Sequence, residues 1–136
     1  MGLEKIAEKK LIASIHNQGM SAWHMDCSVD GFCDILAVGE KNLSFFCEVK
    51  HGPLTKKLFH AFEDSQPIFM MLVEKTGYRN IFQCLYDGKF YHLYQIPNLW
   101  KVCAYDEKSF MDFPVIISSH HTEVVVKKMI EVACGR

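Results

Sequence analysis

Three ionisable residues stand inside two runs of sequence that otherwise have the composition of buried β-strands. Asp34 lies in "GFCDILAV", and Glu48 and Lys50 lie in "LSFFCEVK". Side chains alternate between the two faces of a sheet, so Glu48 and Lys50 are predicted to share one face. Their neighbours Phe45, Cys47 and Val49 are predicted to take the other face. Because charges are costly to bury without compensation, these three residues are the first candidates for chemistry.

The segment "GEKN" between the two runs predicts a turn, which makes the runs neighbouring antiparallel strands. Two registers are open. If the two middle residues form the tip, Asp34 lies opposite Cys47; with one extra residue in the loop, Asp34 lies directly opposite Glu48. Directly opposed side chains have Cβ atoms about 5 Å apart, so the second register brings two carboxylates together.

Two carboxylates in apolar surroundings need a positive charge nearby. Lys50 would supply one, and a divalent cation bound by carboxylate oxygens, a backbone carbonyl and water would supply two more. The spacing alone fits an ordinary buried ion pair, or a strand edge at which these groups reach water, equally well.

Hydrophobic periodicity and turn residues predict the elements that position these side chains. We expect helices over residues 3–18 and 54–65, and strands over 21–27, 31–38, 43–50 and 68–75, the last one buried on both faces. Asp87-Gly88 predicts a β-hairpin, "FPVIISS" a short strand, and "TEVVVKKMIEVA" a C-terminal helix. The order αβββαβ, followed by a β-hairpin and a helix, predicts an α/β fold with a central mixed sheet flanked by helices. The 136 residues predict one domain over residues 1–136.

The composition is that of a globular protein, with 49% hydrophobic residues, 23% charged residues and a net charge of −1. This balance neither suggests nor excludes a nucleic-acid partner, because local patches matter more than the sum. The N-terminal segment lacks the apolar core of a signal peptide, and no apolar run approaches the roughly 20 residues of a membrane helix. We therefore expect a cytoplasmic protein without a membrane partner. The six cysteines form no CxxC pair, so buried thiols are expected rather than a zinc site.

Thirteen residues separate Asp34 of "CDILA" from Glu48 of "EVK", which spans 48–50. This pattern resembles that of the PD-(D/E)xK nuclease superfamily. Cys33 stands where the proline of that name would be. The superfamily has a restriction-endonuclease-like αβββαβ core, the order predicted above. The segment "EKKLIASIHNQGM", from Glu8 to Met20, resembles archaeal-type Holliday junction resolvases, in which a helix glutamate precedes apolar residues and a glycine. The similarity covers about residues 3–75.

The resemblance implies an endonuclease that uses Mg²⁺ or Mn²⁺ to hydrolyse phosphodiester bonds in DNA. Branched or junction DNA in recombination, repair or phage replication is the implied substrate, and a homodimer is implied because two symmetric cuts need two sites. Asp34, Glu48, the Val49 carbonyl and Glu8 would hold the metal, with Glu4 as the competitor of Glu8. Lys50 would orient or deprotonate the attacking water, or neutralise charge on the phosphate.

Contacts with DNA are predicted more weakly at His51, Lys56, Lys57 and Gln66. Each of these residues is equally consistent with an ordinary exposed position. Two other functions remain open from the sequence. One is a non-catalytic module on the same fold that binds nucleic acid or protein, and the other is a nuclease that acts on RNA.

Overall fold

A six-stranded mixed sheet organises the part of the chain that the computed structural model describes, which is residues 2–25, 34–52, 71–95 and 114–135. The strands are β1 (Ser21–His24), β2 (Ile35–Val38), β3 (Ser44–His51), β4 (Ile81–Tyr86), β5 (Tyr91–Gln95) and β6 (Ile117–Ser119). They lie in the order β1-β2-β3-β4-β5-β6. Neighbours are antiparallel except β3 and β4, which are parallel. The predicted α/β class with a mixed sheet is confirmed.

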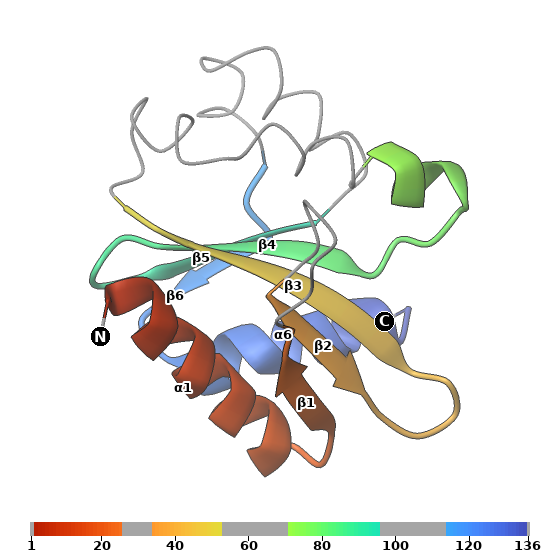
Figure 1. The fold of residues 1–136 in the computed structure, drawn as a ribbon, viewed down its shortest axis with the longest axis horizontal. Coiled ribbons are helices and arrows are strands. Elements are labelled where there is room, and N and C mark those ends of the chain that lie inside the picture. Colours follow the sequence, from red (N-terminus) through yellow and green to blue (C-terminus); the bar gives the residue numbers. More distant parts are fainter. Residues whose placement is uncertain (1, 26–33, 53–70, 96–113, 136) are drawn as a thin grey trace.

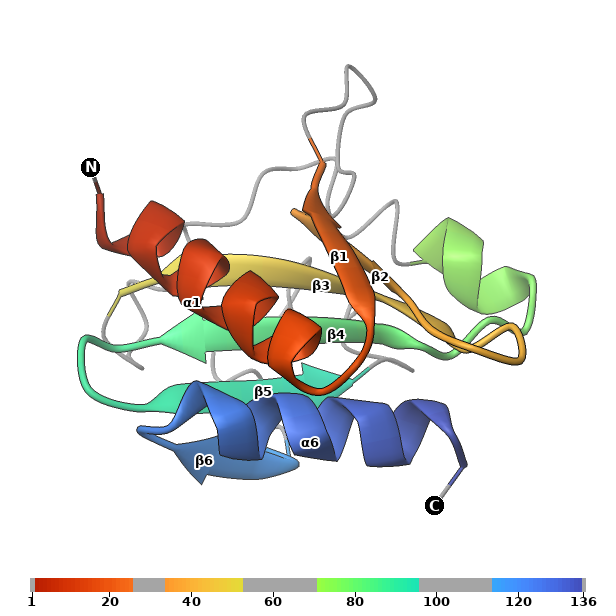
Figure 2. The same ribbon diagram turned by 90° about the horizontal axis from the view of Figure 1, so that it is seen from below.

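Two helices, α1 (Leu3–Asn17) and α6 (Thr122–Ala133), cover one face of this sheet (Figures 1 and 2). They lie side by side, and the Ser14 and Thr122 hydroxyls are 2.6 Å apart where the helices meet. The apolar side of α1, including Leu11 and Ile15, packs against the sheet together with Val125 and Met129 of α6. Burial of this continuous apolar layer is the main source of stability of such a two-layer arrangement.

The side chains of β3 alternate as predicted. Phe45, Cys47 and Val49 are fully buried in the core beneath the helices. The Phe45 ring packs edge to face on Phe82 of β4, with 5.7 Å between the ring centroids. Glu48 and Lys50 therefore share the opposite face of the strand.

The turn between β2 and β3 selects the second of the two registers. Gly39 and Leu43 close a three-residue loop, in which the Gly39 N–H donates to the Leu43 carbonyl at 2.8 Å. Lys41 and Asn42 within the loop have left-handed φ angles of 56° and 64°. The loop thus carries one residue more than a two-residue tip, and Ile35 rather than Asp34 lies opposite Cys47. Asp34, one residue before β2, is in consequence placed opposite Glu48.

The predicted strand over 68–75 is wrong for its described part. Residues 71–75 are helical and are followed by Gly77 in the left-handed region, at φ 85°. A continuous apolar run does not separate a buried strand from a helix, and Met, Leu, Glu and Lys favour helices. Leu72 is 54% exposed, which a strand buried on both faces would not allow. The buried strand beside β3 is β4 instead.

Most other predictions for the described residues are confirmed, with shifts at the ends. The helix at the N-terminus, the hairpin of β4 and β5, the short β6 and the C-terminal helix are all present. β1 and β2 are shorter than predicted, ending at His24 and beginning at Ile35, and β3 starts and ends one residue later. The predicted helix over 54–65 lies outside the described residues.

The described cysteines carry thiols rather than disulfides. Cys47 and Cys84 are buried, as expected, whereas Cys134 is exposed. Burial raises the pKa of the Cys84 thiol to about 12. Among the described residues, no helix is both long enough and apolar enough to cross a membrane.

We predict that Phe45→Ala lowers the free energy of unfolding by about 3–5 kcal/mol, because it removes a fully buried ring and leaves a cavity against Phe82. Leu72→Ala is the matched control and should change stability by less than about 0.5 kcal/mol, since its side chain is exposed. Urea unfolding followed by circular dichroism measures both. Equal losses in the two variants would contradict the core described here.

Candidate functional site

Asp34 immediately precedes β2, and its side chain accepts a hydrogen bond from the backbone of β3. The Val49 N–H of β3 donates to Asp34 Oδ2 at 2.8 Å. On the other side, the Asp34 carbonyl accepts from the Met25 N–H at 2.7 Å, just beyond β1. A residue in a strand directs its N–H and C=O to the same edge, so the Val49 carbonyl is directed to the edge at which Asp34 lies.

Glu48 is next to Asp34 and is almost fully buried, with 3% of its surface exposed. Its pKa is raised to about 9, first by burial and then by the negative charge of Asp34 and a side-chain hydrogen bond with it. Lys50 opposes this shift, and Glu4 adds to it. The two carboxyl groups that the register places opposite each other are therefore in direct interaction.

Lys50 follows Glu48 on the same face of β3. Its ammonium nitrogen is 3.9 Å from Glu48 Oε1, and only 8% of the residue is exposed. At this separation one positive charge compensates part of the negative charge around it.

Glu8 reaches the same region from α1 and is also buried, with 2% of its surface exposed. Its pKa is raised to about 7, first by burial and then by the negative charge of Asp34, against the opposing effect of Lys5. Glu8 Oε2 lies 3.1 Å from His24 Nδ1 and 3.5 Å from Lys5 Nζ. Its other oxygen is buried without a hydrogen-bond partner in the described part of the chain.

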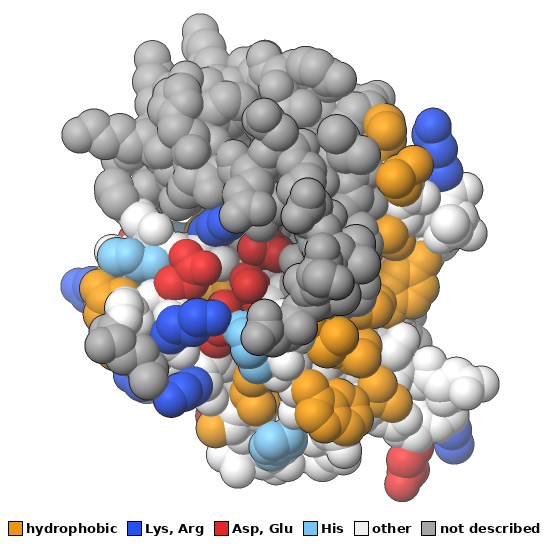
Figure 3. All heavy atoms as spheres, in the orientation of Figure 1, with side chains coloured by type: hydrophobic (Ala, Val, Ile, Leu, Met, Phe, Trp, Pro, Cys, Tyr) orange, Lys and Arg blue, Asp and Glu red, His pale blue; other side chains and the backbone are white. Residues whose placement is uncertain are grey.

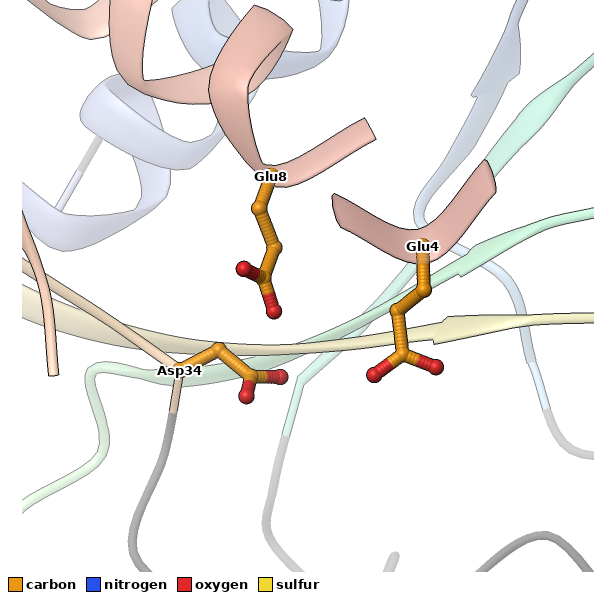
Figure 4. A group of neighbouring side chains, drawn as sticks. All are labelled: Glu4, Glu8 and Asp34. Atoms are coloured by element: carbon orange, nitrogen blue, oxygen red, sulfur yellow. The ribbon is translucent and has the colours of Figure 1, made fainter. Parts of the chain in front are cut away.

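Glu4 and Glu8 are one helical turn apart and point the same way, so the structure brings both to the site rather than choosing between them. Figure 4 shows the two glutamates extending from α1 toward Asp34 at the start of β2. One carboxylate oxygen of each of the three residues lies within 4.8 Å of the others. In Figure 3, acidic side chains gather on this face, with basic and histidine side chains beside them.

Of the residues predicted to contact DNA, His51 lies in the described part of the chain. His51 is half-buried at the end of β3, with its ring 5.9 Å from that of Tyr86. Lys56, Lys57 and Gln66 lie outside the described residues.

Three residues near the carboxylates were not predicted from the sequence. His24 and Lys5 contact Glu8, and their own side-chain nitrogens are 3.4 Å apart. Gln83, fully buried on β4, donates to the Glu48 carbonyl at 3.2 Å. The spacing of Lys5 and Glu8, three residues apart on a helix, was a usable signal. His24 and Gln83 are brought in by strand pairing, for which the local sequence carries no signal.

The donor set suits a hard divalent cation. All of the candidate ligands are oxygens, which Mg²⁺ and Mn²⁺ prefer over nitrogen or sulfur. Ligand oxygens around one octahedral Mg²⁺ lie about 3–4 Å apart, and the 4.8 Å limit for Glu4, Glu8 and Asp34 is slightly wider. A small movement of the glutamate side chains would close that gap. The buried Glu8 oxygen without a hydrogen-bond partner is the atom that such an ion would satisfy.

A comparison with protein-family profiles finds no family that matches this chain, and a comparison with curated proteins finds none of significant similarity. What the site can do is therefore inferred from its own residues.

We predict that, without added metal, the protein loses stability as pH rises from about 5 to 9. Glu8 and Glu48 have raised pKa values of about 7 and about 9 in the folded chain, against an ordinary value of 4.5. Above pH 4.5 the unfolded chain releases these protons first, so unfolding becomes easier until the folded groups also ionise. Thermal melting in EDTA across this range measures the slope.

Glu48→Gln should flatten this slope and raise Tm at pH 8 by about 4 °C, which corresponds to about 1 kcal/mol for a chain of this size. The matched control is Glu131→Gln, on α6 with a side chain that is 38% exposed. That control should leave the slope unchanged. A Tm that is independent of pH in the unmodified protein would show that the carboxyl groups do not crowd as described.

Proposed function

We propose that this chain is a Mg²⁺- or Mn²⁺-dependent endonuclease that hydrolyses phosphodiester bonds in DNA, on a restriction-endonuclease-like fold. The observation that carries the proposal is the convergence of Asp34, Glu48 and Glu8 with Lys50 in a largely buried position. Ordinary ion pairs balance their charges, whereas here four carboxyl groups lie near two lysines and one histidine: Glu4, Glu8, Asp34 and Glu48 near Lys5, Lys50 and His24. The resemblance of "CDILA" and "EVK" to the PD-(D/E)xK pattern supports the same reading.

Asp34, Glu48, Glu8 and the Val49 carbonyl would hold the ion, with Glu4 as a further ligand. When bound, the ion would supply Lewis acidity toward the phosphate and acidify water. The chain itself contributes fixed positions for the ligand oxygens. The Val49 N–H fixes one Asp34 oxygen at 2.8 Å, and His24 and Lys5 lie 3.1 Å and 3.5 Å from one Glu8 oxygen. Such fixed ligand orientations avoid reorganisation during a reaction.

Lys50 would act on the reacting phosphate or on the attacking water. Its ammonium group lies against Glu48 and has little contact with solvent. A buried ammonium can donate hydrogen bonds to the phosphate oxygens as negative charge builds on them. Lys50 would alternatively orient the attacking water by donating a hydrogen bond to it, or act as its base if the amine is neutral when the substrate binds. Either role requires the nitrogen at this position, so a side chain of equal length without the charge should fail.

Branched or junction DNA, a homodimer and a location in the cytoplasm belong to the proposal as its narrower parts. The substrate and the homodimer are supported by the likeness of "EKKLIASIHNQGM" to a resolvase helix and by the need for two symmetric cuts in a junction. The net charge of −1 means that DNA contacts would have to come from local basic residues, among them Lys5 beside the carboxylates and the predicted Lys56 and Lys57.

A second function, a binding module without catalysis, is favoured by one observation. Lys5, His24 and Lys50 already lie within 4 Å of the carboxylates. If these basic groups suffice, the cluster is an internal ion-pair network and no metal is needed. The two experiments below separate these functions.

We predict that the protein nicks plasmid DNA in Mg²⁺ or Mn²⁺ and not in EDTA, and that Lys50→Met lowers the rate at least about 100-fold, the usual effect of losing an acid–base or charge-stabilising group. Methionine keeps most of the apolar stem and removes the charge. Lys9→Met, an exposed position on α1, is the matched control and should cleave normally. Four-way junctions, linear duplexes and RNA are compared in the same assay.

Absence of cleavage on every substrate, in the folded and metal-supplied protein, would exclude the endonuclease and favour the binding module. Equal rates for Lys50→Met and Lys9→Met would exclude the role given to Lys50 while leaving the activity itself in place.

We also predict that Mn²⁺ raises Tm at pH 8, by the equivalent of about 2.7 kcal/mol when its concentration is 100 times the Kd. Asp34→Asn should abolish this rise. Asparagine keeps an oxygen that accepts from the Val49 N–H, so the fold should survive while the charge is lost. Differential scanning calorimetry with and without Mn²⁺ measures the effect, and Glu131→Gln is the control. A rise that persists in Asp34→Asn would place the ion elsewhere.

A further inference from the structure

A second group of chemically matched side chains lies away from the carboxylate cluster, at the hairpin of β4 and β5. His92 of β5 is central to it. One ring nitrogen, Nε2, lies 2.8 Å from Asp87 Oδ2, and the other, Nδ1, lies 2.7 Å from Ser118 Oγ. An acid, an imidazole and a hydroxyl in series at hydrogen-bond distances form the arrangement that activates a serine as a nucleophile.

The fold explains why these three residues meet. Asp87 follows β4 in the hairpin turn, His92 is the second residue of β5, and Ser118 lies directly opposite His92 on β6. Two strand pairings therefore bring together residues that are 26 positions apart along the chain. The group does not include any residue of the proposed metal site.

Asp87 is held rigidly and is kept ionised. Its Oδ1 accepts from the backbone N–H groups of Lys89 at 2.9 Å and Phe90 at 2.7 Å, which leaves Oδ2 for His92. Burial raises the pKa of Asp87, but the hydrogen bonds from His92, Phe90 and Lys89 outweigh that effect and lower it overall.

The direction of both hydrogen bonds follows from this. An ionised carboxylate can only accept, so His92 Nε2 carries a proton and donates it to Asp87. In the neutral ring the other nitrogen, Nδ1, then has a lone pair and accepts. The hydroxyl proton of Ser118 is therefore directed at His92 Nδ1, which is the arrangement required of a general base.

Ser118 is accessible to a reactant. It is exposed on β6, the last strand of the described sheet, whereas the side chains of His92 and Asp87 are only 13% and 24% exposed. The nucleophile thus faces solvent while its two supporting groups are shielded, which favours hydrogen bonds within the group over bonds to water.

We propose that Asp87, His92 and Ser118 form a second reactive site, in which Ser118 attacks activated carboxylic esters. The Ser118 oxygen forms a bond to the ester carbonyl carbon as its proton passes to His92 Nδ1. The bond from that carbon to the leaving oxygen then breaks, and the proton passes from His92 to the departing alkoxide. The products are an acylated Ser118 and an alcohol, and water acting through the same histidine would release the acid.

The test is acetylation by p-nitrophenyl acetate, with the modified residues located by mass spectrometry of peptides after an acid quench. Ser21, exposed on the opposite edge strand β1, is the reference within the same molecule. We expect Ser118 to be acetylated at least about 100 times faster than Ser21, the effect of a positioned general base. EDTA should not change the rate, which distinguishes this site from the proposed endonuclease.

His92→Gln should bring Ser118 to the rate of Ser21, and Asp87→Asn should lower it by at least about 10-fold while keeping the turn that Oδ1 caps. Circular dichroism checks that both variants are folded. Equal acetylation of Ser118 and Ser21 in the unmodified protein would overturn the proposal, with no variant required. A fast Ser118 that is unaffected by His92→Gln in a folded protein would overturn it as well, and would leave the three residues as a structural link between strands.

Discussion

The hydrogen bond from the Val49 N–H to the Asp34 carboxylate determines what the rest of the candidate site can be. A strand that ends in the middle of a sheet leaves its neighbour with unpaired backbone groups, and such groups are costly to leave unsatisfied. At Val49 the Asp34 side chain, rather than a backbone carbonyl, accepts the N–H. This hydrogen bond holds a negative charge against β3, beside Glu48, and near the part of α1 that carries Glu4 and Glu8 (Figure 4). The same contact thus completes the sheet and creates the electrostatic crowding.

The crowded carboxyl groups suit the proposed function but lower the stability of the folded chain. Carboxyl groups whose pKa values are raised by burial and by each other resist ionisation, and the folded chain is less stable for having to hold them. Natural proteins tolerate such local cost mainly where it has a use, so strongly perturbed groups gather at functional sites. His24 and Lys5 on one side of Glu8, and Lys50 beside Glu48, relieve part of it. The balance between these basic groups and the carboxylates is the physical quantity that separates a metal site from an internal ion-pair network.

The sequence predicted what depends on local pattern. The periodicity of α1, the Asp87-Gly88 hairpin and the alternation that places Glu48 and Lys50 on one face were all correct. The register of β2 and β3 stayed open because it depends on Lys41 and Asn42 adopting left-handed angles, which neither residue type dictates. The strand predicted over residues 68–75 was wrong for residues 71–75 because an apolar run has the same composition in a strand and in a helix. His24, Gln83 and the pairing of His92 with Ser118 could not be predicted, since partners from other strands bring them into place.

The parallel pairing of β3 with β4 has a consequence for how the chain assembles. The antiparallel pairs β2–β3 and β4–β5 can form as soon as a short turn closes, whereas β3 and β4 meet only after the two ends of residues 52–80 come together. Closing a longer loop costs more chain entropy and slows the contacts that depend on it. Glu4, Glu8, Asp34, Glu48 and Lys50 all precede that loop, so the contacts among them do not require β3 and β4 to pair first. Asp87 and His92 follow that loop and share the hairpin of β4 and β5, whereas Ser118 joins them only when β6 pairs with β5.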